Sequence, residues 1–258
     1  MKIISVMNVK GGVGKSLTAE CLARGFAQSH KTLIVDGDGQ GDVTQSVMPD
    51  LDFDGNPDLA ERTISAALTG RLPIEDCIWQ TEIPGLDVLP SNMDLFDTIY
   101  ELQGKGGSDF ILAKLLQTLD YEYVIIDNNP SVNKMLFNAI YASDVIICPT
   151  NIGRKTLKGV ANTRKVVMEA IDTLPYIKPL EFRLLLTMIG NNRNSKEGEA
   201  QLREVYGDEV LHTRIRYQQK PVQDAEFTHT DLMADSKAGV AADYRAMVEE
   251  VIDLEDRA

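Results

Sequence analysis

Short runs of consecutive apolar residues alternate with amphipathic segments along almost the whole chain of 258 residues. The apolar runs are rich in β-branched residues and several lack polar alternation, which is typical of parallel strands covered by helices on both faces. The expected strands are residues 3–7, 32–35, 86–89, 123–126, 145–148 and 183–188. The expected helices, with apolar residues at helical spacing, are residues 17–28, 63–68, 109–118, 132–142, 157–172 and 239–254.

This order of elements predicts one domain, residues 1–258, of the α/β class. Its sheet would be doubly wound and mostly parallel, with helices on both faces. Residues 50–58 and 103–108 are rich in Pro, Gly or Asp and are predicted to be surface loops. Five apolar residues are expected to form the buried side of the last helix: Val240, Tyr244, Val248, Val251 and Ile252.

A glycine-rich loop separates the first expected strand from the first expected helix. Residues 9–16 are Val-Lys-Gly-Gly-Val-Gly-Lys-Ser, and glycines between a strand and a helix N-terminus let several backbone N–H groups point at one anion. In such a P-loop the final lysine reaches the terminal phosphates and the serine hydroxyl binds Mg²⁺. The residues expected to bind nucleotide are Lys10, Gly11, Gly12, Val13, Gly14, Lys15, Ser16 and Leu17.

This loop departs from the ordinary P-loop pattern at its first position, where Val9 stands in place of glycine. A second lysine, Lys10, comes directly before the glycines. Two lysines that flank this glycine pattern are much rarer in sequences than three glycines alone. Three glycines alone could belong to a plain turn. The sequence therefore favours a nucleotide site over a glycine-rich turn.

Two further strands are predicted to end in acidic residues. Asp36 and Asp38 follow one of them, and Asp127 follows the other. The carboxyl ends of parallel strands lie beside the P-loop, where carboxylates near Mg²⁺ and near the attacking water would serve hydrolysis. A helix N-cap is the alternative role for Asp127. Residues 36–42 also resemble the start of a calcium loop, but Val47 stands where that loop needs a glutamate.

The charge distribution leaves two interpretations open. A net charge of −13 argues against nonspecific nucleic-acid binding by the chain as a whole. Residues 151–220, however, contain 13 Lys and Arg against 8 Asp and Glu, a local excess of five positive charges. Residues 221–258 contain 10 acids against 3 bases. The basic zone is compatible with contact to a polyanion and equally with scattered surface lysines.

Composition predicts a cytoplasmic protein. Cys21, Cys77 and Cys148 are too few and too scattered for a disulfide framework or a C-x-x-C metal site, so reduced, packed cysteines are expected. No apolar stretch approaches the roughly 20 residues that a membrane-spanning helix needs. The first expected strand begins close to the first residue, so no signal peptide is expected.

Three motifs together resemble the ParA family of DNA-partitioning ATPases, which has a deviant Walker A motif. They are Lys-Gly-Gly-Val-Gly-Lys-Ser at 10–16, Val-Asp-x-Asp-x-Gln-Gly at 35–41 and Ile-Ile-Asp-x-x-Pro-Ser at 125–131. Segments 89–95 and 235–239 match family patterns too, and the chain is similar to the short members without an N-terminal regulatory domain. Gly39 and Asn129 each replace a family proline, which affects loop stiffness and timing more than the acids themselves.

The resemblance implies a Mg²⁺-dependent ATPase with a defined role for each motif residue. Lys15 and Ser16 would hold the phosphates and Mg²⁺. Asp36 and Asp127 would act through the inner or water shell of the metal, so that the implied metal site comprises Ser16, Asp36 and Asp127. Asp38 would orient the attacking water.

The resemblance also implies three partners: a second copy of the chain, duplex DNA and a ParB-like adaptor protein. Lys10 would cross the interface of an ATP-dependent dimer and touch the phosphates of the partner's nucleotide, much as an arginine finger does. Arg193 and Arg216 fall where the family contacts DNA without sequence preference, so that the ATP-bound protein would associate with the nucleoid. Weaker candidates for DNA contact are Arg214, Lys220 and Lys237.

Four alternative functions make different demands on the sequence. A membrane-cycling relative of the MinD type would need a basic C-terminal amphipathic helix, whereas residues 249–258 are acidic. An iron–sulfur carrier would need interface cysteines, for which Cys148 is a poor candidate. A tyrosine autokinase would need a tyrosine cluster near the C-terminal end, which is absent. A nucleotide switch that does not hydrolyse ATP is disfavoured by Asp38, but only turnover measurements exclude it.

Overall fold

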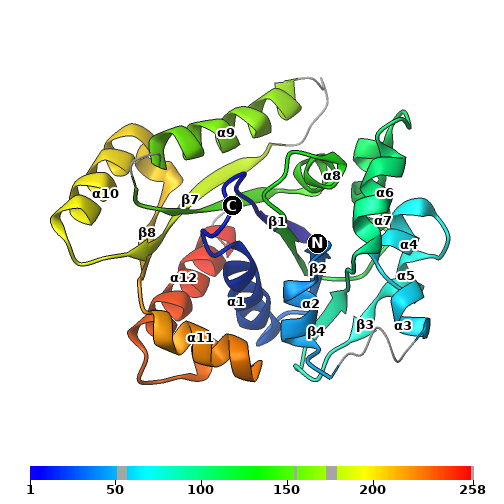
Figure 1. The fold of residues 1–258 in the computed structure, drawn as a ribbon, viewed down its shortest axis with the longest axis horizontal. Coiled ribbons are helices and arrows are strands. Elements are labelled where there is room, and N and C mark those ends of the chain that lie inside the picture. Colours follow the sequence, from blue (N-terminus) through cyan, green and yellow to red (C-terminus); the bar gives the residue numbers. More distant parts are fainter. Residues whose placement is uncertain (51–56, 154–155, 173–178, 257–258) are drawn as a thin grey trace.

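The computed structural model describes residues 1–50, 57–153, 156–172 and 179–256, which share one eight-stranded sheet (Figure 1). The strand order is β3-β4-β2-β5-β1-β6-β7-β8, and every pairing is parallel except that of the edge strand β3 with β4. The strands are β1 Lys2–Val6, β2 Thr32–Gly37, β3 Trp79–Gln80, β4 Leu86–Leu89, β5 Tyr123–Asn128, β6 Val145–Asn151, β7 Glu181–Ile189 and β8 Val210–Arg216.

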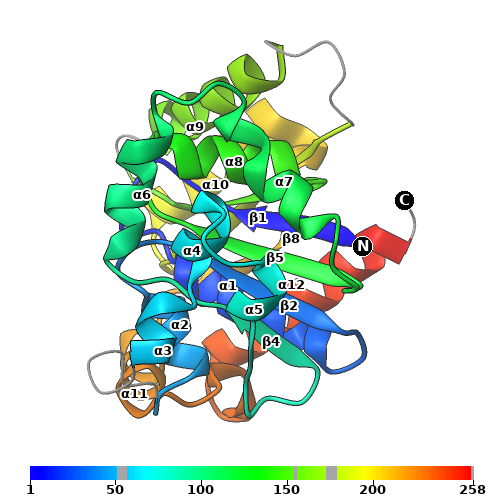
Figure 2. The same ribbon diagram turned by 90° about the vertical axis from the view of Figure 1, so that its right-hand side faces the viewer.

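Helices cover both faces of this sheet (Figure 2). On one side lie α4 Ile64–Thr69, α5 Ile74–Cys77, α6 Asp94–Leu102, α7 Ile111–Leu116, α8 Lys134–Ala142, α9 Thr156–Asp172 and α10 Arg193–Tyr206. On the other lie α1 Lys15–Ala27, α2 Asp42–Val47, α11 Gln219–Thr228 and α12 Gly239–Asp256. Shorter pieces are α3 Pro57–Glu61, η1 Ser108–Phe110, η2 Gly207–Glu209 and η3 Leu232–Ala234.

Two hydrophobic cores result, one on each face of the sheet. In β1, Ile3 packs in one core while its neighbours Ile4 and Val6 pack in the other. Successive side chains of a strand point to opposite faces, so a strand that is covered on both sides has to be apolar throughout. The predicted doubly wound α/β fold with helices on both faces is therefore confirmed.

All of the predicted strands are present, with ends that differ by a few residues, and each of the six predicted helices overlaps an α-helix of the structure. The segment predicted as one helix at 109–118 is divided into η1 and α7. The loop predicted at 103–108 consists mainly of turns and bends. The loop predicted at 50–58 is wrong at its end, because α3 begins at Pro57, and its residues 51–56 lie outside the described residues.

Several elements were not predicted: β3, β8, α2, α3, α5, α6, α10 and α11. β8 is a strand at the edge of the sheet, in which the side chains of His212, Arg214 and Arg216 are exposed between more buried neighbours. A search for continuous apolar runs misses such a strand. α10 was missed for a similar reason, because Ser195 and Leu202 are its only buried residues.

Helix α12 packs directly against α1, beside it in Figure 1. A Cβ atom at Gly25 of α1 would lie within 3 Å of both methyl groups of Val248, so this close approach requires glycine. The predicted buried side of α12 is confirmed for Val240, Tyr244, Val248 and Val251, whereas Ile252 is half-buried. Among the described residues, no helix has both the length and the apolar character needed to cross a membrane.

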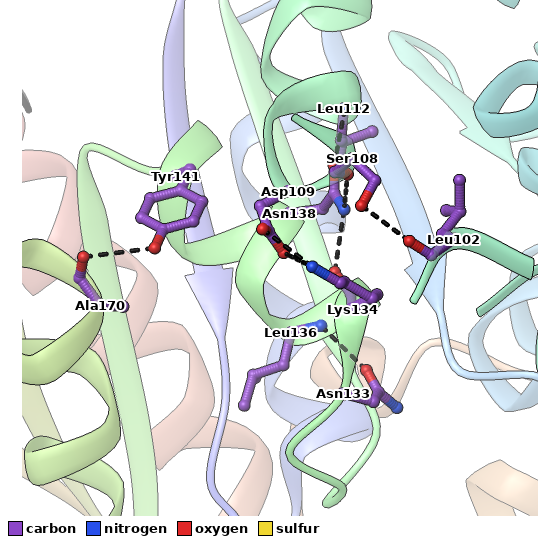
Figure 3. Close-up of polar contacts among 10 residues, drawn as sticks. All are labelled: Leu102, Ser108, Asp109, Leu112, Asn133, Lys134, Leu136, Asn138, Tyr141 and Ala170. Carbon is purple, nitrogen blue, oxygen red and sulfur yellow. Dashed lines mark hydrogen bonds and ion pairs between the residues drawn. The ribbon is translucent and has the colours of Figure 1, made fainter. Parts of the chain in front are cut away.

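Polar contacts fix α8, the helix that follows β5, to its neighbours (Figure 3). The side chain of Asn133 caps its N-terminus by accepting a backbone N–H of the first turn. Asn138 is fully buried and hydrogen-bonds to backbone atoms of η1 and α7. Lys134 forms an ion pair of 2.8 Å with Asp109. Helix α8 is therefore firmly anchored, and it fixes the C-terminal end of the segment that joins it to β5.

Candidate functional site

The glycine-rich loop joins β1 to α1 and turns sharply at two glycines. Gly12 has a φ of +67° and Gly14 a φ of +83°, values that residues with a side chain rarely adopt. Gly14 directly precedes α1, and no described side chain caps this helix. The N–H groups of its first turn are therefore available to an anion. The two glycines and the uncapped start of α1 are compatible with the predicted phosphate cradle.

Residues from distant parts of the chain hold this loop in place. The hydroxyl of Thr187 in β7 donates to the carbonyl of Val13 at 2.9 Å. The side-chain oxygen of Asn8 accepts hydrogen bonds from the N–H of Lys10 at 2.9 Å and from the hydroxyl of Thr163 at 3.1 Å. Sequence reasoning missed these anchors, because none of them belongs to a motif that could mark it.

A cavity of about 470 Å³ extends from the loop along the carboxyl edge of the sheet. Its size falls in the usual range for small-molecule sites. One end is lined by the predicted nucleotide-binding residues from Gly11 to Leu17 and by Asp38. The rest of the lining was not predicted: it includes Arg216, Tyr217, Gln218 and Val222, while Met188 and Tyr244 lie beside Gly14 itself. The cavity therefore joins a phosphate-binding end to a mixed apolar and polar end.

Asp36 is fully buried at the end of β2 and its carboxylate is well hydrogen-bonded. One oxygen accepts the N–H of Thr44 at 2.9 Å and its hydroxyl at 2.6 Å, and the other accepts the N–H of Asp38 at 3.0 Å. Burial nevertheless raises the pKa of Asp36 to about 6, because these hydrogen bonds offset only part of the lost solvation. Thr44 was not predicted; it follows Asp36 by eight residues and no motif marks it.

Asp127 lies directly beside Asp36 in the register of β2 and β5, and it is also fully buried. Neither carboxylate oxygen has a hydrogen-bond partner among the described residues. Burial and then the charge of Asp36 raise its pKa well above the usual range, although Ser16 and Lys15 oppose this shift. Two adjacent buried carboxylates, one of them unpaired, are costly unless a cation neutralises them. These oxygens therefore fit the ligand preference of Mg²⁺.

Lys15 and Asp38 supply opposite charges at the phosphate end of the cavity. Lys15 is only 8% exposed, and burial lowers the pKa of its ammonium group while Asp127 and Asp38 raise it. Burial also raises the pKa of the half-buried Asp38, one oxygen of which accepts the N–H of Gln40 at 3.1 Å. The structure thus brings these two predicted catalytic residues to the same end of the cavity.

Lys10 does not line the cavity of its own chain, unlike the seven residues that follow it in the loop and the first turn of α1. Its ammonium group donates to the side-chain oxygen of Asn151, at the end of β6, at 2.6 Å. The ammonium group of Lys10 is thus held at β6 and not in the cavity with Lys15 and Asp38, although the backbone carbonyl of Lys10 accepts a 3.5 Å hydrogen bond from Lys15.

The two arginines predicted to bind DNA occupy different surroundings. Arg193 begins α10, and its highly exposed side chain forms an ion pair of 2.7 Å with Glu197. Arg216 ends β8 and lines the cavity, where its guanidinium group makes two hydrogen bonds of 2.7 Å to Asp243 of α12. Of the weaker candidates, Arg214 pairs with Glu199 and Lys220 with Asp224. Neighbouring carboxylates therefore neutralise much of the basic zone found in the sequence.

Comparison with known proteins identifies the family. A family model described as an AAA domain matches residues 1–178. The chromosome-partitioning ATPase Soj of Thermus thermophilus is 31% identical over 252 residues, which cover 96% of this chain and 94% of Soj. The chain belongs to the ParA/Soj family of partitioning ATPases. The chromosome partitioning protein ParA of Caulobacter vibrioides is 27% identical over 261 residues, 99% of this chain and 95% of that protein.

A solved structure from the same group has the same fold. The plasmid partition protein of Borrelia burgdorferi, bound to AMPPNP, superposes with a TM-score of 0.83 at 25% identity, and the match covers 98% of each chain. The resemblance of the three motifs to ParA proteins is therefore confirmed. As a member of the ParA/Soj family, the chain is a P-loop ATPase.

Proposed function

We propose that this protein is a Mg²⁺-dependent ATPase that dimerises on ATP, binds DNA nonspecifically and partitions a plasmid or chromosome with a ParB-like partner. The observation that carries the proposal is the arrangement of Asp36 and Asp127 beside the glycine-rich loop. Both are fully buried, they are adjacent in register, and Asp127 has no partner among the described residues. Because the chain belongs to the ParA/Soj family, we expect the ligand of these carboxylates to be Mg²⁺ bound to ATP.

The chain's own residues account for binding of the nucleotide. The N–H groups at the start of α1 and the ammonium of Lys15 would hold the phosphates, and the mixed end of the cavity would hold the base and sugar. Ser16 and the paired carboxylates Asp36 and Asp127 would hold Mg²⁺ directly or through water. When bound, Mg²⁺ neutralises charge on the phosphates and orients them.

Hydrolysis in this proposal depends mainly on positioning and on charge, as is usual for phosphoryl transfer. Asp38 lies at the phosphate end of the cavity, and its carboxylate would accept a hydrogen bond from the attacking water. Lys15 would offset negative charge that shifts toward the leaving phosphate. Weak turnover without partners is expected, because Lys10, the second lysine of the motif, does not line the cavity of its own chain.

The position of Lys10 supports the proposed dimer. This lysine lies outside its own cavity but directly precedes the loop that forms it. If two subunits meet with their cavities facing, Lys10 of each could reach the nucleotide of the other. ATP would then be part of the interface, and hydrolysis would release the dimer.

DNA binding would use Arg193 and Arg216 on the surface of the dimer. Two copies double the number of phosphate contacts, which matters because nonspecific affinity grows with each neutralised phosphate. The same reasoning predicts strong dependence on salt. A ParB-like partner would then act on the DNA-bound dimer and speed hydrolysis. We therefore expect the protein to be cytoplasmic and to associate with the nucleoid while ATP is bound.

The experiment that tests the proposal is ATP hydrolysis measured with and without Mg²⁺ and with and without duplex DNA. We expect turnover that requires Mg²⁺ and rises with DNA. Turnover that DNA leaves unchanged would favour a cargo-positioning ATP switch that does not act on DNA. Absence of Mg²⁺-dependent turnover under every condition, with ATP still bound, would favour the switch without hydrolysis and contradict the proposal.

A further inference from the structure

Helix α6 places an aromatic ring directly on the loop that carries Asp38. A Cβ atom at Gly39 would lie 2.6 Å from Cε2 of Phe96 and 2.9 Å from two further atoms of the same ring. Carbon atoms in favourable contact are about 3.5–4.0 Å apart. The ring therefore fills the space that the side chain of any other residue at position 39 would need.

This need for glycine comes from the ring and not from the backbone. Gly39 does not have a positive φ, whereas Gly41, two residues later, has a φ of +72°. A residue with a side chain could therefore adopt the backbone conformation of Gly39 if the ring were absent. Gly39 is buried, while 41% of Phe96 remains exposed, so the ring covers the loop from the solvent side.

Besides this contact, the loop is held by local hydrogen bonds and by the side-chain amide of Gln40, which donates to the sulfur of Met93 at 3.9 Å. The N–H of Asp38 donates to Asp36, and the N–H of Gln40 donates to the carboxylate of Asp38 at 3.1 Å. The N–H of Gly41 donates to the carbonyl of Asp38, also at 3.1 Å. The carboxylate of Asp38 thus takes part in the turn itself. Its place at the phosphate end of the cavity consequently depends on the shape of that turn.

We propose that Phe96 is a positioning residue for Asp38. Its ring, resting on Gly39, holds the turn at 38–41 in the shape that directs Asp38 toward the phosphate end of the cavity. The inference rests on the proposed function, in which Asp38 orients the attacking water. Phe96 does not line the cavity, so it acts through the turn and not through contact with nucleotide.

Hydrogen exchange of the nucleotide-free protein tests the packing without any enzymatic readout. Phe96→Ala should speed exchange of the backbone N–H groups at 38–41, while Phe96→Leu, which keeps part of the bulk, should have a smaller effect. Tyr100→Ala is the matched control, because Tyr100 lies one turn further along α6 and is 78% exposed. Equal exchange at 38–41 in Phe96→Ala and Tyr100→Ala would overturn the inference.

A double-mutant cycle tests whether the ring and Gly39 act together. Gly39→Ala alone should lower the midpoint of urea unfolding, because the added methyl group meets the ring. In the Phe96→Ala background the same substitution should cost clearly less, since contacting residues are coupled and independent ones are additive. Additive shifts in the two backgrounds would contradict the proposed contact.

Steady-state kinetics then links the packing to the reaction. Phe96→Ala should lower kcat about tenfold, because misplacing a reacting group is costly, and it should leave KM for ATP unchanged. Tyr100→Ala should keep both constants. If the wild type hydrolyses ATP and Phe96→Ala keeps its kcat, the inference fails while the proposed function stands. If the wild type shows no hydrolysis, the proposed function fails, and hydrogen exchange alone decides whether Phe96 holds the turn.

Discussion

The ammonium group of Lys10, in the loop after β1, donates a 2.6 Å hydrogen bond to the side chain of Asn151, which ends the neighbouring strand β6. Both side chains are half-buried. The lysine that the proposed dimer needs is therefore held on its own subunit in the single chain. To reach a partner's nucleotide, it has to exchange this acceptor for phosphate oxygens.

The contact predicts that Asn151→Ala favours the dimer. Each subunit of the dimer loses one such hydrogen bond, worth about 1 kcal/mol, so the protein concentration needed for dimerisation should fall about 30-fold. Analytical ultracentrifugation with a non-hydrolysable ATP analogue and Mg²⁺ measures this concentration. Asn194→Ala is the control, because Asn194 is an exposed amide on α10. Weaker dimerisation of Asn151→Ala would contradict the prediction.

Asp38→Ala should separate hydrolysis from binding. The carboxylate lies at the phosphate end of the cavity, and its loss should lower kcat by about 100-fold if it orients water. ATP binding and dimerisation should persist, because the glycine-rich loop and Lys15 are unchanged. Single-turnover hydrolysis and nucleotide titration together measure both properties. Normal turnover of the variant would refute the role of Asp38.

Asp127→Asn should stabilise the protein without Mg²⁺. The substitution removes a buried carboxylate whose oxygens have no hydrogen-bond partner among the described residues, so the free energy of unfolding should rise by about 1–3 kcal/mol in the presence of EDTA. The further stabilisation that Mg²⁺ and ATP give to the wild type should be largely lost. Urea unfolding measures both effects, and Asp97→Asn, at an exposed position of α6, is the control. A less stable variant in EDTA would contradict the account of Asp127.

The two arginines should affect DNA binding in different ways. Arg193 is highly exposed and away from the cavity, so Arg193→Ala should weaken DNA binding and leave ATP affinity unchanged. Arg216→Glu should weaken both, because Arg216 lines the cavity and pairs with Asp243. Each lost phosphate contact should reduce the slope of log affinity against log salt by about one. Gel shifts with ATP at several salt concentrations provide the test, and an unchanged shift for both variants would place the surface elsewhere.

The sequence could predict those parts of the fold whose pattern is complete within one segment. The strand beginning at Tyr123 is apolar on both faces, and α12 shows a clear buried side, so both were predicted. β8 and α10 were missed because each buries only a few residues and exposes most of its polar residues. Position at the edge of a sheet depends on the order of strands, which a local pattern does not contain.

The candidate site divides in the same way. The glycine-rich loop and the acids at the ends of β2 and β5 were predicted, because each stands in a contiguous motif. The contact of Thr187 with Val13 spans 174 residues of sequence, and that of Lys10 with Asn151 spans 141. Such pairs meet only when the sheet is assembled. The packing of Phe96 on Gly39 belongs to the same class.

The central claim, that two subunits join across their bound nucleotides, is tested most directly by light scattering with a non-hydrolysable ATP analogue and Mg²⁺. We expect the wild type to double its mass, and Lys10→Ala to bind the analogue yet stay at the mass of one chain. A wild type that remains monomeric while saturated with the analogue, or a Lys10→Ala variant that dimerises equally well, would contradict the account.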